Sequence, residues 1–125
     1  MPVVMENVRT ITQKAGAAIA QYRFVKSDGA GGVIQSAAEG DQTVGVSLDA
    51  ASGAGVRIPI ALPGCRVAIE AGAAIAAGAS VETDSVGRAV TLGGATARGL
   101  GFVEEAAGGA GAIVTLVYSP NIAVV

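Results

Sequence analysis

The chain has 125 residues, a net charge of −2 and an apolar fraction of 51% that is mostly Ala and Val, with two Phe, two Tyr and no Trp. This length suffices for one domain, and because small side chains bury little apolar area each, partner subunits or a bound surface would add stability. The eight basic residues are scattered, which excludes nucleic acid as the implied partner, and the lack of histidine removes the commonest general base and metal ligand.

Residues 1–14 precede the rest of the pattern. Val8, Thr10 and Thr12 alternate with Arg9, Ile11 and Gln13, which predicts a two-sided strand without a clean apolar face. Fully extended, these residues would reach on the order of 45 Å. Two interpretations stay open here: a frayed terminus with a first strand, or an arm that docks on a neighbour. No basic region followed by an apolar run is present, so no export is predicted.

The segment Ala-Gly-Ala-Ala-Ile-Ala at residues 15–20 returns at residues 71–76. With the chain laid on itself at this offset, roughly 15 of about 41 positions are identical without a gap. We therefore predict two copies of one β-rich unit, at about residues 15–62 and 71–118. Alanine favours a helix in the repeated segment, but Gly16, Gly72 and Gly78 oppose it, so a turn is the preferred interpretation.

The first copy reads as four short strands, at residues 22–26, 33–34, 43–49 and 56–62. Asp28 and Gly29 mark a turn after the first of them. The third and fourth strands are expected to form a hairpin. Pro59 cannot donate a hydrogen bond to a neighbouring strand, so the fourth strand is predicted to lie at a sheet edge or to carry a bulge.

The second copy repeats this plan after a strand at residues 65–70, with strands at 80–83, 88–92, 98–104 and 112–118. Thr115 stands at the position of Pro59, so the last strand is free to pair centrally. Cys65, the single cysteine, cannot form an intramolecular disulfide and is interpreted as a structural strand residue. The most apolar window, residues 71–79, is about half a membrane span long, which excludes a transmembrane helix. About ten short strands predict an all-β class, a small β-barrel or sandwich forming one domain over residues 15–125.

Motifs for chemistry fail when they are tested. Residues 72–81 resemble the turn signature of biotinyl and lipoyl carrier domains, but the following tip has no lysine. The glycine-rich residues 29–32 and 108–111 lack the partners of a phosphate-binding loop. The carboxylates Glu104 and Glu105 are interpreted as a solvated strand end, and Glu39 with Asp41 forms no calcium-binding pattern. We predict no enzyme, no cofactor and no metal site.

Three segments, at residues 44–51, 71–81 and 99–107, carry a family resemblance. Together they resemble the small capsid cement, or head decoration, proteins of tailed bacteriophages, over about residues 40–118. The resemblance implies a non-enzymatic virion protein, made in the host cytoplasm, that binds the outer surface of the major capsid protein shell and stabilises it. It implies a homo-oligomer, a trimer ahead of a dimer, with no nucleic acid or membrane partner. Alternatives are a tail or baseplate subunit and a small carrier or ligand-binding barrel.

The same resemblance assigns candidate contact residues by position. An N-terminal arm over residues 1–14 would bind the capsid through Pro2, Val3, Val4, Met5, Val8, Arg9 and Ile11. Subunit contacts would come from the Pro59 strand and the apolar tail, through Ile58, Pro59, Ile60, Ile122, Val124 and Val125.

Overall fold

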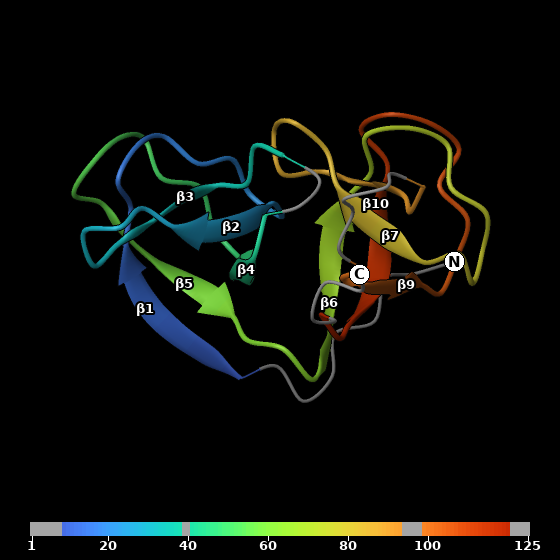
Figure 1. Ribbon diagram of the computed structural model, residues 1–125, viewed down its shortest axis with the longest axis horizontal. Helices are drawn as coiled ribbons and strands as arrows, with labels where there is room; N and C mark the ends of the chain where they lie inside the picture. Colours follow the sequence, from blue (N-terminus) through green and yellow to red (C-terminus); the bar gives the residue numbers. More distant parts are fainter. Residues whose placement is uncertain (1–8, 39–40, 94–98, 121–125) are drawn as a thin grey trace.

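The computed structural model describes residues 9–38, 41–93 and 99–120, and every structural statement below concerns those residues. Within them the chain forms ten strands in three antiparallel sheets and no helix, so the predicted all-β class is confirmed. Figure 1 shows β1 to β5 in one lobe and β6 to β10 in the other.

The first half is a single five-stranded sheet. Its strand order is β1-β5-β4-β2-β3, and all of its neighbouring strands run antiparallel. The strands are β1 (Thr10–Lys14), β2 (Phe24–Ser27), β3 (Val33–Gln35), β4 (Thr43–Ser47) and β5 (Arg57–Ala61). The hairpin expected from the third and fourth predicted strands is the β4-β5 pair, which is confirmed.

The second half contains the two smaller sheets. One has the order β6-β10-β9, and the other is the β7-β8 hairpin. Their strands are β6 (Cys65–Glu70), β7 (Val81–Thr83), β8 (Ala89–Thr91), β9 (Gly101–Val103) and β10 (Ile113–Tyr118). A bridge between Ser80 and Phe102 joins the two sheets. The central place of β10 agrees with the expectation from Thr115.

Strand pairing in the second half repeats that of the first half at an offset of 56 residues. Thr10 lies opposite Ala61, and Arg66 lies opposite Val117. The same offset relates further pairs: Val25–Gln35 and Val81–Thr91, Phe24–Val46 and Ser80–Phe102, Ser47–Ile60 and Val103–Leu116, Ile19–Ala51 and Ile75–Ala107. With the Ser80 bridge included, the second half has the order β6-β10-β9-β7-β8, which corresponds strand for strand to β1-β5-β4-β2-β3.

The segment that occurs twice in the sequence closes each half. Residues 15–20 contain bends and isolated bridges and no helical turn, in agreement with the preferred interpretation. The Ala15 N–H donates to the carbonyl of Val56 at 2.8 Å, and Ile19 forms a bridge with Ala51. The side chains of Ala15 and Ile19 are buried. The segment therefore ties the end of β1 to the start of β5 and supplies core residues on the way.

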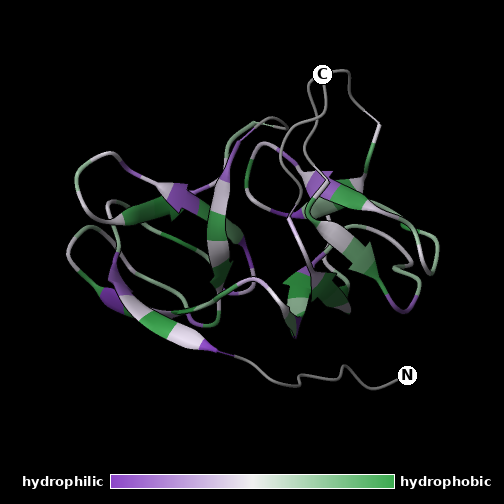
Figure 2. Cartoon of the chain, turned by 60° about the horizontal axis from the view of Figure 1, so that its bottom comes forward, coloured by the Kyte–Doolittle hydropathy of each residue, from purple (hydrophilic) through white to green (hydrophobic). Residues whose placement is uncertain are grey.

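Two apolar clusters make up the core. One belongs to the first half alone and includes Val25, Ile58 and Ile60. The other belongs to the second half but also takes in Phe24, Val46 and Ala61. Successive strand residues point to opposite faces, so Val25 packs into its own half while Phe24 packs against the other. Figure 2 shows the resulting alternation of apolar and polar residues along the strands.

Pro59 lies neither in an edge strand nor at a bulge, because the registers of both ladders of β5 are regular, so that prediction was wrong. β5 pairs with β1 on one side and with β4 on the other. The N–H and C=O of a strand residue point to the same side, and the Pro59 carbonyl accepts from Leu48, just beyond the end of β4. The position of the absent Pro59 N–H therefore lies on the β4 side of β5, just beyond the last hydrogen-bonded pair of the β4-β5 ladder. In the second half the corresponding N–H of Thr115 donates to Glu105 Oε1 at 2.5 Å.

Candidate functional site

The two halves meet where the β7-β8 hairpin covers the start of β2. The Phe24 N–H donates to the Gly87 carbonyl at 2.7 Å, and Arg23 Nη1 donates to the Val86 carbonyl at 3.0 Å. Arg23 also forms an ion pair with Glu70, with 3.2 Å between Nη2 and Oε2. Both of these charged side chains are largely buried. The hairpin of one half is therefore held on the sheet of the other by main-chain and charge-assisted hydrogen bonds.

An aromatic pair extends this contact. The rings of Phe24 and Tyr118 lie 6.0 Å apart between centroids at an interplanar angle of 47°, a favourable tilted arrangement. The Tyr118 hydroxyl forms a 2.7 Å hydrogen bond with Thr43 Oγ1, so the buried polar group has a partner in the other half. Burial raises the pKa of Tyr118 well above its ordinary value, while the bond to Thr43 opposes that shift.

This raised pKa predicts a loss of stability at alkaline pH. Above about pH 10 the unfolded chain loses the tyrosine proton while the folded chain retains it. The free energy of unfolding should then fall by about 1.4 kcal/mol per pH unit for this proton. Tyr118→Phe should be about 1 kcal/mol less stable at pH 7, through loss of the Thr43 bond, but should show a shallower decline above pH 10.

Urea titrations of both proteins between pH 7 and 11.5 would measure this difference. Parallel pH profiles for the two proteins would contradict the assignment of the alkaline decline to Tyr118.

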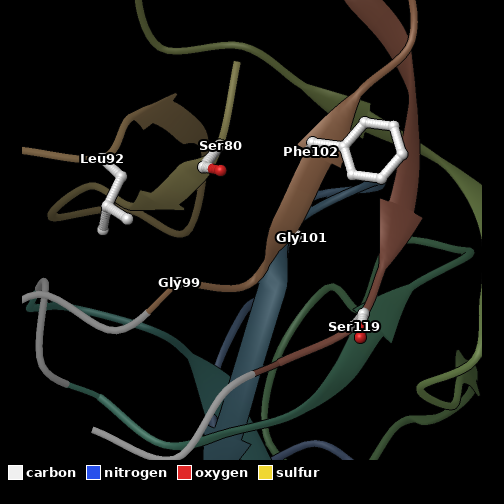
Figure 3. A pocket seen from close by; sticks show the side chains of 6 residues that line it. All are labelled: Ser80, Leu92, Gly99, Gly101, Phe102 and Ser119. Carbon is white, nitrogen blue, oxygen red and sulfur yellow. The ribbon is translucent and has the colours of Figure 1, made fainter. Parts of the chain in front are cut away.

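The corresponding face of the second half is open. Phe102 and Leu92 are 42% and 37% exposed, although Val46, at the position of Phe102 in the first half, is wholly buried. A pocket of about 230 Å³ lies here, lined by Ser80, Leu92, Gly99, Gly101, Phe102 and Ser119. Figure 3 shows Leu92 on one side, Phe102 on the other and Ser80 between them. Its lining mixes the apolar side chains of Leu92 and Phe102 with two serine side chains and two glycines, so it offers both apolar surface and hydrogen-bonding groups.

The groups that were candidates for chemistry have structural contacts. The Cys65 thiol is buried, donates to the Leu62 carbonyl at 3.1 Å, and has a pKa raised by that burial. Glu104 pairs with Arg66 at 3.1 Å, and Asp41 pairs with Lys26 at 3.1 Å. Among the described residues, no group of three or more His, Cys, Asp or Glu side chains could hold a metal ion. That part of the chain also contains no helix of the length and apolarity required to cross a membrane.

The predicted contact residues fall in different places. Pro2, Val3, Val4, Met5, Val8, Ile122, Val124 and Val125 lie outside the described residues. Arg9 is exposed, and Ile11 lies in β1 and packs against the core of the first half. Ile58 and Ile60 are buried in that core, whereas Pro59 between them is half-buried.

The sequence reading missed the contact between the halves. Arg23, Phe24 and Gly87 were interpreted only as strand or turn residues. The alignment of the two halves carries the signal that could have found them. Phe24 aligns with Ser80 and Arg23 aligns with Ala79, so the two halves differ sharply in side-chain size and charge at these positions.

The fold is similar to that of a bacteriophage head protein of known structure. The crystal structure of the N base of head fiber gp8.5 in bacteriophage phi29 is similar to this chain, with a TM-score of 0.70 and 26% sequence identity. The match covers 90% of this chain and 94% of the phi29 chain. No protein-family model and no curated protein sequence matches the chain.

Proposed function

We propose that this chain is a structural protein of a tailed-phage virion that attaches to the outer surface of the head and stabilises the shell of the major capsid protein. The observation that carries this is the fold match to a phage head fiber base, which extends over nearly the whole of both chains. A non-catalytic role agrees with the contacts described above, because the Cys65 thiol is buried and Glu104 and Asp41 form ion pairs within the fold.

Multivalency explains how such a small protein could stabilise a shell. A chain with a net charge of −2 and small apolar side chains offers modest contacts to any single partner. Many copies on a symmetric shell, each touching more than one capsid subunit, would convert weak contacts into a large total effect. Stabilising a shell in this way requires a folded protein that contacts neighbouring capsid subunits, and it requires no catalytic centre.

Three finer features belong to the same proposal. The chain comprises two copies of one β unit, which the recurrence of strand pairing at an offset of 56 residues supports. The capsid-binding arm is the segment preceding β1, because Thr10–Lys14 of the predicted arm is paired with β5 in the sheet. The working unit is a homo-oligomer, a trimer in preference to a dimer.

Co-sedimentation tests head attachment and the arm separately. The full chain and a variant lacking residues 2–8, which leaves β1 intact, would be mixed with phage heads assembled without this protein. The full chain should pellet with the heads, and the truncated chain should bind at least about tenfold more weakly. Failure of the full chain to pellet would refute head attachment. Equal binding of both proteins would refute the arm alone.

A further inference from the structure

One face of the fold is covered in the first half and bare in the second. In the first half, Phe24 on this face contacts the β7-β8 hairpin and Tyr118, and both Phe24 and its cross-strand partner Val46 are wholly buried in the same apolar cluster. In the second half the corresponding pair is Ser80 and Phe102, directly opposite each other in the same register. Phe102 is 42% exposed and borders the pocket described above. Among the described residues, the chain therefore contains one covered and one exposed version of the same kind of docking face.

The hairpin tip that would fill the bare face is also free. In the second half the tip residue Gly87 is buried, and a Cβ added there would lie 2.8 Å from the Phe24 carbonyl oxygen. Its counterpart Gly31, between β2 and β3, has a similar φ of 91° but is exposed, with no atom within 4 Å of an added Cβ. Ala30 is exposed, as is its counterpart Val86 at 38%, so the position that becomes buried in this kind of contact is the glycine.

We propose that the β2-β3 hairpin tip of one copy, residues 28–32, docks on the Ser80–Phe102 face of a second copy. The contact between copies would repeat the contact that already exists inside the chain between the β7-β8 hairpin and β2. This inference deepens the homo-oligomer assignment in the proposed function by naming its two surfaces, but the internal contact carries it independently of any capsid.

Each of the two faces carries one phenylalanine and one smaller side chain. Within each cross-strand pair one residue is aromatic and the other is smaller: Phe24 with Val46, and Ser80 with Phe102. The phenylalanine stands on one strand of the pair in the first half and on the opposite strand in the second half. In the copy that supplies the hairpin tip, Leu62 stands at the position of Tyr118, whose ring packs on Phe24, so Leu62 would face Ser80, beside the exposed ring of Phe102, on the other copy. Burying that exposed ring supplies the driving force for association.

The charges differ in a way that can be tested. The internal contact has the ion pair between Arg23 and Glu70. The corresponding positions in the contact between copies are Ala79 and Lys14, and the Lys14 side chain is exposed. Because the two docking surfaces are different patches of one chain, the contact is head-to-tail, and closed rings arise when its rotation closes. A closed ring leaves no docking face bare.

Sedimentation equilibrium of the purified full chain, without heads, tests the surfaces. The chain should self-associate, and Ala30→Glu and Phe102→Ser should each weaken association at least about tenfold. Ala54→Glu, at an exposed loop position of the same half, serves as the matched control and should leave association unchanged. A chain that remains monomeric, or an oligomer that both tip and face variants leave intact, would overturn the inference.

A charge cycle tests the geometry itself. If the copies meet as the halves do, Ala79→Arg should face Lys14 and weaken association about threefold, and adding Lys14→Glu should restore or exceed the original affinity. Purely additive effects of the two changes would overturn the assignment of these positions as neighbours. Because no heads are present, failure here leaves head attachment standing, whereas failure of co-sedimentation leaves self-association standing.

Discussion

Phe24→Ala should lower the free energy of unfolding by about 3–5 kcal/mol. The ring of Phe24 is wholly buried and belongs to the apolar cluster that draws on both halves, and it lies 6.0 Å from the ring of Tyr118. Truncation removes its buried area and leaves a cavity that the surrounding sheets close only in part. A urea titration of the two proteins would measure the difference. Because Phe24 belongs to the cluster shared by both halves, we expect the substitution to weaken mainly the contact between them.

Phe102→Ala is the matched control, because Phe102 lies on the corresponding face of the second half. Its ring is 42% exposed in the single chain, so the same substitution should cost only about 0.5–1 kcal/mol. The measurement belongs at a dilution where the chain is monomeric, since self-association would bury this ring. Equal losses from the two substitutions would contradict the difference in burial between the faces.

The strands were predictable because their signals are local. Val44, Val46 and Leu48 alternate with smaller or polar residues, and Asp28 with Gly29 terminates β2 in the expected turn, where Gly29 has a φ of 81°. The offset of 56 residues was also visible in the sequence, in residues 15–20 and 71–76, and the strand pairs described above recur at the same offset.

Long-range pairing was less accessible from the sequence. The missing N–H of Pro59 requires an edge strand only if the neighbouring strand extends past Pro59 on that side. Here β4 ends before that point, and the identity of residue 59 does not indicate where β4 ends. Tyr22 has a φ of 60°, a value that favours glycine, and it is Gly78 that stands at the corresponding position. The Tyr22 carbonyl accepts from Glu70 in the other half, so a contact between distant segments, not a local preference, holds this backbone.

The contact between the halves could not be derived because its residues are ordinary in isolation. A buried ion pair such as Arg23–Glu70 and a carbonyl contact such as Phe24 to Gly87 leave no periodic trace in the sequence. They become informative only against the second copy, where Ala79 and Ser80 replace Arg23 and Phe24. Positions that differ between the two aligned halves, such as Arg23 and Ala79, therefore include those where the halves meet.

Gly87→Ala should destabilise the chain by about 2–4 kcal/mol. Gly87 has a φ of 81°, where an L side chain is strained by about 1–2 kcal/mol. An added Cβ would also lie 2.8 Å from the Phe24 carbonyl oxygen and 3.2 Å from Arg23 Cβ. Main-chain atoms cannot give way as a flexible side chain can, so the β7-β8 hairpin must lift from β2. The bond from the Phe24 N–H to the Gly87 carbonyl would then be lost.

Gly31→Ala isolates the part of this cost that comes from the close approach. Gly31 has a φ of 91°, so the backbone strain and the effect of alanine on the unfolded chain are nearly the same as at Gly87. Because no atom lies within 4 Å of an added Cβ, the substitution should cost about 1 kcal/mol in the dilute monomer. Thermal or urea unfolding of the pair measures the difference directly. A Gly31→Ala loss as large as that of Gly87→Ala would mean that strain alone is responsible. At concentrations where copies associate, the same Gly31→Ala chain should lose affinity for its partner, because the tip that is free in one chain is the tip that the next chain covers.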